Sequence, residues 1–460
     1  MVKAMESNSK SRKESILIKY AIFSRLLVLF LTLLWRSLLQ PYDTSATLNP
    51  PCLYHKDVVE DSPPLLVANA VSKTLENSVV WDSVYFLRIT QCGYEYEQTY
   101  AFLPLLPFFI SLLSRTAFAP LVPLIGLRAV MVLSGYVVSN LAFVIAAIYL
   151  FRTLKHHSEL RLCSASIRRP YFIRQYIQKV CMLFSQLEAC ITCYLTMHRA
   201  YEALYQKRRV WLSLQVLVTG FLRCVCICLP FVAFQAYGYY NICHGRKPDE
   251  LRPWCKARVP LLYNFIQSHY WGVGFLRYFQ FKQLPNFLLA SPILSLAMCS
   301  IMSYMTARPE LFISLGFQAT EKEKRSAARL YSLKDAVEPD VKTSSHEGNR
   351  DIRQRKSSRK KDVSVTSVAV DFVSPKKSGY FSADVFPFVI HLGLMAATAF
   401  FIMHVQVATR FLSASPPLYW FASHLVASPK HSKWGYLIWS YCAAYILLGT
   451  LLFSNFYPFT

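Results

Sequence analysis

The stretch that decides the fold is Gln283–Ala307, with the sequence QLPNFLLASPILSLAMCSIMSYMTA, which carries no charged residue. A helix rises about 1.5 Å per residue, so a run of this length crosses a hydrocarbon core of about 30 Å. Charged side chains are costly at the bilayer centre. The stretch therefore predicts a membrane-spanning helix.

Further stretches of the same apolar character occur along the chain, and 54% of all residues are hydrophobic. Arg25 and Arg36 flank the short uncharged part of the first of them, and we expect these side chains to reach opposite membrane faces or to pair with other helices. The sequence predicts an all-α, polytopic transmembrane protein of one domain, residues 1–460. The additional predicted spans are Ile16–Leu39, Ala129–Phe151, Val210–Cys243, Pro387–Thr409 and Trp434–Thr460.

The net charge of +24 is concentrated outside these spans. Arg308–Lys377 is rich in Lys, Arg and Ser, which predicts a disordered basic cytosolic loop at about residues 308–380 rather than a nucleic-acid interface. Positive charge marks the cytosolic side of membrane proteins. We therefore place this loop, the N-terminus and Arg152–Arg209 in the cytosol.

Alternation of the spans then assigns the remaining segments. Residues 40–100, 244–282 and 410–433 are all predicted to lie on the non-cytosolic side, the first as a long loop. Because residues 40–100 are predicted to be non-cytosolic and Arg152–Arg209 cytosolic, Ala101–Phe151 can make only one net crossing of the membrane. Ala101–Leu127, which contains four prolines, is therefore predicted to form interfacial or re-entrant helices.

The non-cytosolic segments carry the unusual polar and aromatic residues. Asp82 follows Trp81 and is a candidate catalytic carboxylate, with a helix N-cap as the structural alternative. Glu95 and Glu97 are further acidic candidates. Arg277 and Arg410 lie beside apolar helix ends, where they either bind an anion such as a phosphate or form structural pairs. The other candidates, for which an interfacial aromatic or polar role is the alternative, are Trp81, Gln98, Gln267, His269, Tyr270, Trp271, Gln283, Asn286 and His404.

Several of these motifs resemble one known family. Two dipeptides and three longer motifs are those of the GPI mannosyltransferase 2 family, which the chain therefore resembles. They are Trp81-Asp82, Gly93-Tyr94, the Ala-Phe-x-Pro of residues 101–104, the Tyr-Trp-x-Val-Gly-Phe-Leu-Arg-Tyr of residues 270–278 and the Pro-Asn-Phe-Leu-Leu-Ala-x-Pro of residues 285–292. The resemblance covers residues 15–155, 197–335 and 380–460 and is greatest to plant-type members.

The resemblance implies a GT-C-like glycosyltransferase of the endoplasmic reticulum membrane. Such an enzyme would transfer mannose from dolichyl-phosphate mannose to a GPI-precursor glycolipid at the lumenal face, with inversion at the anomeric carbon. Asp82 would accept the acceptor proton, with Glu95 and Glu97 as rivals. Arg410 or Arg277 would stabilise the leaving lipid phosphate, so we expect neither a metal nor a cofactor. The family also implies a small accessory membrane subunit.

Cysteine placement adds two weaker expectations. Cys243 and Cys255 fall on the predicted lumenal side, as do Cys52 and Cys92, so either pair could form a disulfide in that oxidising compartment. Cys190 and Cys193 have the spacing of half a metal site, but no second pair or histidine supports one.

One segment departs from the family pattern, at about residues 163–196. It carries Arg168, Arg169, Arg174, Lys179 and Glu188, which are too many charges for a span. A locally frame-shifted or mis-spliced sequence and true divergence both explain it. In either case we expect Cys163–Tyr194 to pack poorly or to stay at the cytosolic surface, which would remove part of a cavity wall and with it the activity of this chain.

Two alternative functions remain open on sequence alone. One is a different dolichyl-phosphate-mannose-dependent transferase of the same class. The other is a transporter or a non-catalytic membrane subunit, although transporters commonly show internal repeats and bind their substrates at the bilayer midplane.

Overall fold

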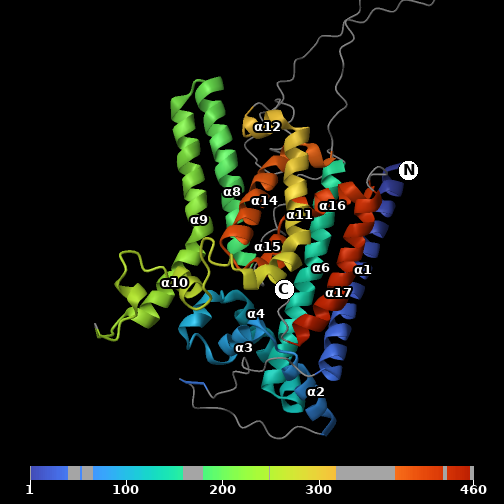
Figure 1. The fold of residues 1–460 in the computed structure, drawn as a ribbon, viewed down its shortest axis with the longest axis vertical. Helices are drawn as coiled ribbons and strands as arrows, with labels where there is room; N and C mark the ends of the chain where they lie inside the picture. The colour runs from blue at the N-terminus through green and yellow to red at the C-terminus, as the bar shows by residue number, and fades with distance from the viewer. Residues whose placement is uncertain are drawn as a thin grey trace, which may run out of the picture.

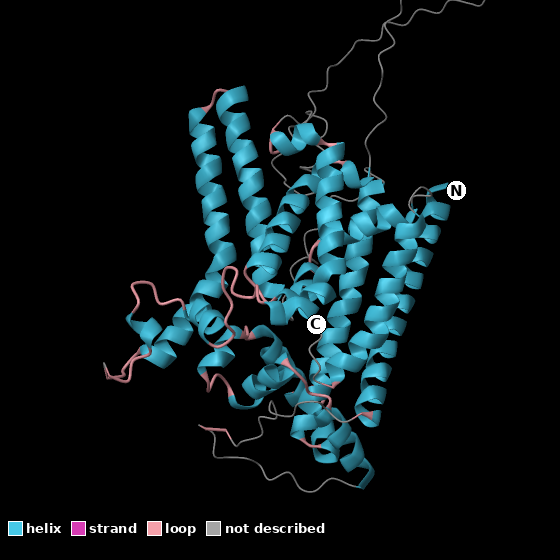
Figure 2. Ribbon diagram, viewed as in Figure 1, coloured by secondary structure: helices cyan, strands magenta, loops and turns pink. Residues whose placement is uncertain are grey.

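The computed structural model describes residues 2–39, 52–53, 66–158, 180–247, 249–317, 379–427 and 432–455. Over these ranges the chain is helical and contains no strand (Figure 2). Five helices are long and apolar enough to cross a membrane. They are α1 (Val2–Leu38), α6 (Leu127–Ser158), α9 (Val210–Cys243), α11 (Leu284–Ala307) and α17 (Ser432–Ser454). The prediction of an all-α polytopic membrane protein is confirmed.

Short helices gather at one end of the bundle, the lower end in Figure 1, which we term the site end. Phe86, Leu106 and Met131, from three different helices, meet there in one buried apolar cluster. The region from α4 to α5 is bent by 66°, in agreement with the predicted interfacial or re-entrant character of residues 101–127. The elements of this group are α2 (Leu66–Asn77), α3 (Asp82–Cys92), η1 (Glu97–Ala101), α4 (Leu105–Arg115), η2 (Ala119–Leu121) and α5 (Val122–Ile125).

The remaining elements extend the bundle at its two ends. Towards the site end, α9 leads into η4 (Pro253–Lys256), α10 (Leu262–His269) and η5 (Phe281–Gln283), which precedes α11. At the opposite end a second apolar cluster joins Tyr304 of α11, Tyr380, Phe386 and Phe421. The elements there are α12 (Pro309–Ile313), η7 (Gly379–Phe381) and η8 (Ala383–Val385).

The predicted span Pro387–Thr409 is not a single helix. α14 (Phe386–Phe401) ends within the predicted run, and the chain continues as η9 (Val405–Val407) and α15 (Ala408–Leu412). Two carbonyls at the end of α14 accept hydrogen bonds from another segment: Gly274 N donates to Ile402 O at 3.1 Å, and Leu276 N donates to Phe401 O at 2.7 Å. The helix can end there because these carbonyls are satisfied without a further helical turn.

The prediction that residues 410–433 all lie on the non-cytosolic side is wrong. α16 (Pro416–Ala427) runs back to the opposite end, where His424 packs on Tyr380 and Phe381. α17 then starts beside Val426 and ends at the site end, where Phe453 contacts Trp81. With 12 residues, α16 is shorter than the roughly 20 expected of a span, so hydropathy did not identify it.

The prediction for Cys163–Tyr194 is wrong in its last part. α8 (Val180–Tyr201) is helical and, followed by η3 (Glu202–Gln206), pairs antiparallel with α9 (Figure 1). Ser213 Oγ donates to Ala200 O at 2.9 Å, and Ile191 and Tyr194 pack on the cluster around Tyr304. Residues 188–194 are therefore packed within the bundle. Residues 163–179 lie outside the described residues.

The prediction of a disordered loop over residues 308–380 is wrong at both ends of that range. The Arg308 side chain is bonded to Glu310 at 2.5 Å and to Phe381 O at 3.1 Å, and Leu311 is buried. Arg308–Phe317 is thus ordered, as is η7. Residues 318–378 lie outside the described residues.

The corrected path of the chain gives a topological prediction. A short glycosylation-acceptor loop inserted after Asp249 should be modified, because that position is at the site end. Insertions after Leu315 and between α16 and α17 should stay unmodified, because Leu315 and the adjoining ends of these helices lie at the opposite end, which the positive-inside rule predicts to be cytosolic. Gel mobility before and after enzymatic deglycosylation measures the outcome. Modification of the α16–α17 insertion would contradict the return of α16.

Candidate active site

Asp82 lies at the first position of α3 and faces Arg410, which is 328 residues away in the chain. Arg410 Nη1 donates to Asp82 Oδ2 at 2.8 Å. The side chain of Arg410 is 41% exposed and that of Asp82 is 29% exposed, so the pair remains accessible to a ligand. Trp81, not Asp82, occupies the N-cap position, and its side chain makes no capping bond. The helix-cap alternative for Asp82 is therefore wrong.

Trp81 holds this corner of the site in an unusual conformation. Its φ is 52° with ψ −131°, a region that side chains with a Cβ rarely adopt. The indole Nε1 donates to Phe453 O at 3.0 Å, and its ring stacks on Phe453 with centroids 6.5 Å apart. Backbone strain of this kind costs about 1–3 kcal/mol and concentrates at functional sites. The contact with α17 fixes the direction in which the side chain of the neighbouring Asp82 projects from the backbone.

The break after α14 brings Arg410 to Asp82. Since α14 ends at Phe401, the chain turns through η9 and restarts as α15, which carries Arg410. Ala408 and Leu412, on either side of Arg410, are fully buried and anchor α15. A continuous helix through residues 402–409 would have carried this arginine beyond the site.

A second polar group surrounds Tyr278. Asn286 Nδ2 donates to the Tyr278 hydroxyl at 2.8 Å and to Gln283 Oε1 at 2.7 Å. The Tyr278 hydroxyl donates in turn to Gln406 Oε1 at 3.3 Å, and His404 stacks on the Tyr278 ring with centroids 4.6 Å apart. Burial raises the pKa of Tyr278, which keeps the hydroxyl neutral and able to donate. Gln406 lies one turn before Arg410, so this group adjoins the Asp82–Arg410 pair.

Glu97 is the centre of a third group. It is buried and accepts hydrogen bonds from Trp254 Nε1 at 2.5 Å and from the Tyr270 hydroxyl at 2.6 Å, with Arg252 Nε 3.7 Å away. Burial and the hydrogen bond to Glu97 raise the pKa of Tyr270 to about 12. The carboxylate thus ties η1 to the segment between α9 and α11.

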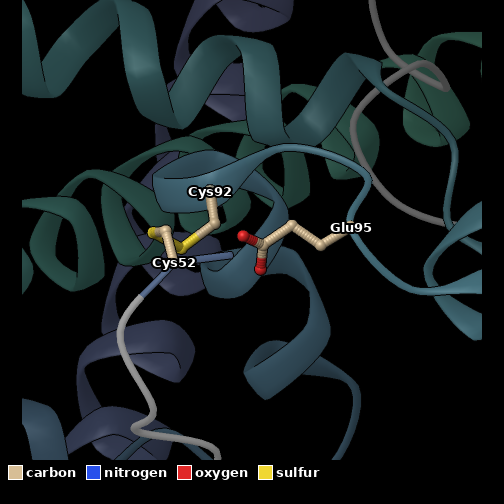
Figure 3. Close-up of side chains that lie close together, drawn as sticks. All are labelled: Cys52, Cys92 and Glu95. Carbon is tan, nitrogen blue, oxygen red and sulfur yellow. A yellow bond between two sulfur atoms is a disulfide. The ribbon is translucent and has the colours of Figure 1, made fainter. Parts of the chain in front are cut away.

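Glu95 is held beside a disulfide (Figure 3). Its Oε2 pairs with Arg88 Nη2 at 2.6 Å, and its Oε1 accepts a bond from Leu53 N at 2.5 Å. Cys52, Cys92 and Glu95 have the proximity of metal ligands. However, Cys52 and Cys92 are bonded to each other, and metals bind thiolates rather than disulfide sulfurs. The group is therefore a cross-link and not a metal site.

Both disulfides that the sequence allowed are present. Besides Cys52–Cys92, Cys243 at the end of α9 is bonded to Cys255 in η4. Cys193 remains a free thiol and lies with its Sγ 3.6 Å from that of Cys224. Both disulfides lie at the site end, as expected of an oxidising compartment on that side.

The remaining predicted residues surround these groups without joining them. Trp271 packs edge-on against Phe102 with centroids 6.1 Å apart. His269 is exposed and stacks on Phe265 at 4.8 Å. Gln98 is half-buried within η1, Gln267 accepts a backbone bond from Val273 N at 2.9 Å, and Arg277 is exposed with its side chain against Gly274.

Some residues of these groups were missing from the predicted site. Arg88 gave no signal except its distance of seven residues from Glu95, and a pair with a buried carboxylate cannot be inferred from that. Tyr278 ends the motif of residues 270–278, next to the predicted Arg277, and Gln406 is two residues after the predicted His404. Arg252 and Trp254 form a basic and aromatic pair around Pro253 in the predicted lumenal segment.

Comparison with known proteins supports a common origin over nearly the whole chain. The sequence matches the family described as Mannosyltransferase (PIG-V) over residues 12–167 and 159–460. The two matched stretches overlap at residues 159–167, and the second runs through residues 163–196, where a departure from the family pattern was predicted. No solved structure matches the chain.

Named relatives come from animals and fungi. The chain is 25% identical over 551 residues to the GPI alpha-1,6-mannosyltransferase 2 of Homo sapiens, with 98% of this chain and 99% of the relative covered. It is 25% identical over 508 residues to the GPI mannosyltransferase 2 of Drosophila melanogaster, with 96% and 99% covered. A fungal relative, the GPI mannosyltransferase 2 of Aspergillus oryzae, is 41% identical over 121 residues, which are 24% of this chain and 26% of the relative. From the extent of the family match, this chain belongs to the PIG-V mannosyltransferase family.

Proposed function

We propose that this protein transfers the second mannose, in α1,6 linkage, from dolichyl-phosphate mannose to the GPI-anchor precursor. The family membership and the names of the full-length relatives support the reaction. The observation that carries the proposed mechanism is the pair of Asp82 and Arg410, an accessible carboxylate and an accessible guanidinium 2.8 Å apart at the site end.

We place the reaction at the lumenal face of the endoplasmic reticulum membrane. The two disulfides support an oxidising compartment at the site end. Arg308 and the basic segment that follows it begin at the opposite end, which the positive-inside rule assigns to the cytosol.

The proposed chemistry is a single inverting displacement. The 6-hydroxyl of the acceptor mannose attacks the anomeric carbon of the donor, and the bond from that carbon to the phosphate oxygen breaks. Asp82 takes the hydroxyl proton, acting as a general base. Arg410 stabilises the negative charge that develops on the leaving dolichyl phosphate. No metal is required, because the guanidinium supplies the positive charge.

The Tyr278 group is suited to hold the sugar. Amide side chains and a tyrosine hydroxyl can exchange their mutual hydrogen bonds for bonds to sugar hydroxyls. Asn286, Gln406 and Tyr278 already form such a chain, and Gln406 lies one turn before Arg410. We assign this group to acceptor or donor hydroxyl recognition next to the reacting atoms.

Complementation tests the proposed reaction. The loss of activity expected from sequence is not retained, because Ile191 and Tyr194 pack within the bundle and the family match runs through the segment. Expression of the full chain in cells that lack the second GPI mannosyltransferase should therefore restore surface GPI-anchored proteins and remove the accumulated precursor with a single mannose. Expression in cells that lack the first or third GPI mannosyltransferase should restore nothing. Rescue of one of those cells instead would assign the chain to a different step. If the chain fails to rescue the cells, and a chimera in which the relatives' segment replaces residues 163–196 does rescue them, this segment inactivates the chain.

Substitution Asp82→Asn tests the base. The asparagine side chain is nearly isosteric but accepts a proton poorly, so mannose transfer should fall by about 10²–10⁴-fold. Stability should change by only about 1 kcal/mol, because the pair with Arg410 is partly exposed. Initial rates with purified protein in nanodiscs measure the first effect, and thermal unfolding measures the second. Asp249→Asn, an exposed acid in the same non-cytosolic region, is the matched control. Near-normal transfer by Asp82→Asn would exclude this residue as the base.

Paired arginine variants test the phosphate assignment. Arg410→Gln should reduce kcat by about 10²-fold or more because the developing phosphate charge loses its partner, whereas Arg410→Lys should keep part of the rate. Arg277→Gln should reduce kcat far less. Steady-state kinetics with dolichyl-phosphate mannose provides the comparison. A larger loss at Arg277 than at Arg410 would transfer the phosphate-binding role to Arg277.

A further inference from the structure

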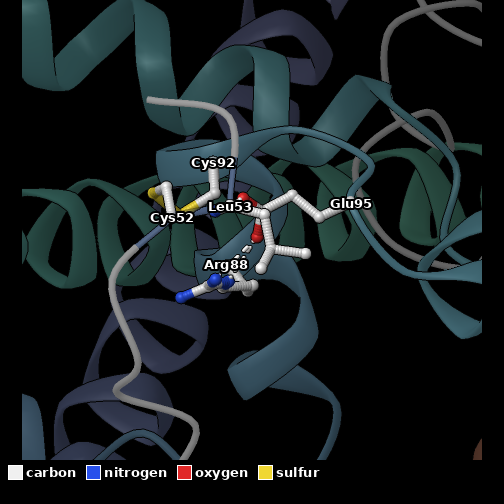
Figure 4. Close-up of a disulfide and its surroundings, with 5 residues drawn as sticks. All are labelled: Cys52, Leu53, Arg88, Cys92 and Glu95. Carbon is white, nitrogen blue, oxygen red and sulfur yellow. Dashed lines mark hydrogen bonds and ion pairs between the residues drawn. A yellow bond between two sulfur atoms is a disulfide. The ribbon is translucent and has the colours of Figure 1, made fainter. Parts of the chain in front are cut away.

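Three covalent or polar connections converge at the C-terminal end of α3 (Figure 4). Cys92, the last residue of α3, is bonded to Cys52. Glu95 accepts bonds from Arg88 Nε at 3.0 Å and Nη2 at 2.6 Å, and its other oxygen accepts the bond from Leu53 N. The side chains of Arg88 and Glu95 are only 4% and 1% exposed. These residues, with the disulfide, form what we term the α3 clamp.

The local sequence makes the clamp possible. Gly93 ends α3 with φ of 77°, a conformation that favours glycine, and the chain reverses so that Glu95 returns to Arg88 one turn before the helix end. Leu53 directly follows Cys52, so the disulfide and the backbone bond act on the same point of the first non-cytosolic segment.

The clamp lies at the end of α3 opposite to Asp82. α3 is 11 residues long, with Asp82 first and Cys92 last. Phe86, Leu87 and Ile89 pack α3 into the bundle, but apolar contacts are non-directional and do not fix its rotation. The two bonds that Arg88 donates to Glu95 Oε2 and the disulfide do fix it, because both connections have narrow geometry.

The proposed reaction requires such a device. The Asp82–Arg410 pair must separate when Arg410 turns to the donor phosphate and Asp82 to the acceptor hydroxyl. During that step the contact of Trp81 with Phe453 continues to hold the start of α3, and the clamp holds the other end of the helix. We infer that Arg88, Glu95 and the Cys52–Cys92 disulfide are positioning elements, which act through α3 to keep Asp82 at the reacting hydroxyl. This inference rests on the proposed role of Asp82 and gives Glu95 a role other than that of a base.

Kinetics of clamp variants test the inference. Glu95→Gln, and Cys52→Ser combined with Cys92→Ser, should each lower kcat about tenfold while KM changes little, because a displaced base affects the reacting geometry rather than binding. Both should shift the acidic limb of the pH–rate profile in the same direction. The variant that combines all three substitutions should have a kcat only slightly below that of the more impaired of the two variants, because all three substitutions act on the same clamp.

Amide hydrogen exchange of α3, followed by mass spectrometry, provides a readout that does not depend on activity. Exchange at residues 82–92 should accelerate in both clamp variants. The matched control is Cys243→Ser combined with Cys255→Ser, which removes the other disulfide at the site end and should leave both kcat and α3 exchange unchanged. If Glu95→Gln does not fold, it is replaced by Arg88→Lys, which keeps the charge but cannot donate from two nitrogens to Glu95 Oε2 in the same way.

The possible outcomes are distinct. Loss of the acidic limb in Glu95→Gln, with α3 exchange unchanged, would make Glu95 the base and overturn the inference. Faster exchange with unchanged kcat, or failure of both Glu95→Gln and Arg88→Lys to fold, would show that the clamp stabilises the fold without positioning Asp82. Normal transfer by Asp82→Asn would instead defeat the proposed function, while the exchange measurement would still show whether the clamp holds α3.

Discussion

Two backbone hydrogen bonds, from Gly274 and Leu276 to the last carbonyls of α14, allow the chain to leave a helix inside the bundle. Unpaired carbonyls are costly away from water, so irregular backbone at membrane depth must be satisfied by other parts of the protein. The segment before α11 provides this, and α15 can then start at a new angle with Arg410 on it. The same segment carries Tyr278, so one connection organises both the guanidinium and the polar group beside it.

The site is thus assembled from parts of the chain that are remote in sequence and are held by different forces. Apolar packing embeds α3, α4 and α6, and a second apolar cluster joins α11, α14 and α16. Polar connections then set the orientation where apolar packing cannot. Glu97 ties η1 to Trp254 and Tyr270, and Trp81 is fixed to the end of α17. The Asp82–Arg410 pair lies where these units meet and stays partly exposed.

The residue types of the site were accessible from sequence, but their pairing was not. Asp82 and Arg410 each stood out by an unusual neighbourhood, yet 328 residues separate them and Arg277 was an equal candidate. The break after Phe401 could not be predicted, because Ile402-Met403-His404 contains neither Gly nor Pro and the bonds that allow it come from another segment. Because α16 is shorter than a typical span, it was not counted among the predicted crossings. The direction predicted for α17 was therefore the reverse of the observed one. Lys430, after α16, and Lys433, in the first turn of α17, were the available signal for placing this connection in the cytosol. The predicted sidedness allowed both disulfides without determining the pairing, and the structure contains both.

The most direct measurement of the central claim is an experimental structure of the protein in nanodiscs with a donor analogue that cannot transfer its sugar. We expect the lipid phosphate to lie within hydrogen-bond distance of Arg410 and the Asp82–Arg410 pair to be open. Asp82 should face the anomeric carbon from the side opposite to the phosphate. A phosphate bound at Arg277, with the Asp82–Arg410 pair still closed at 2.8 Å, would contradict the central claim.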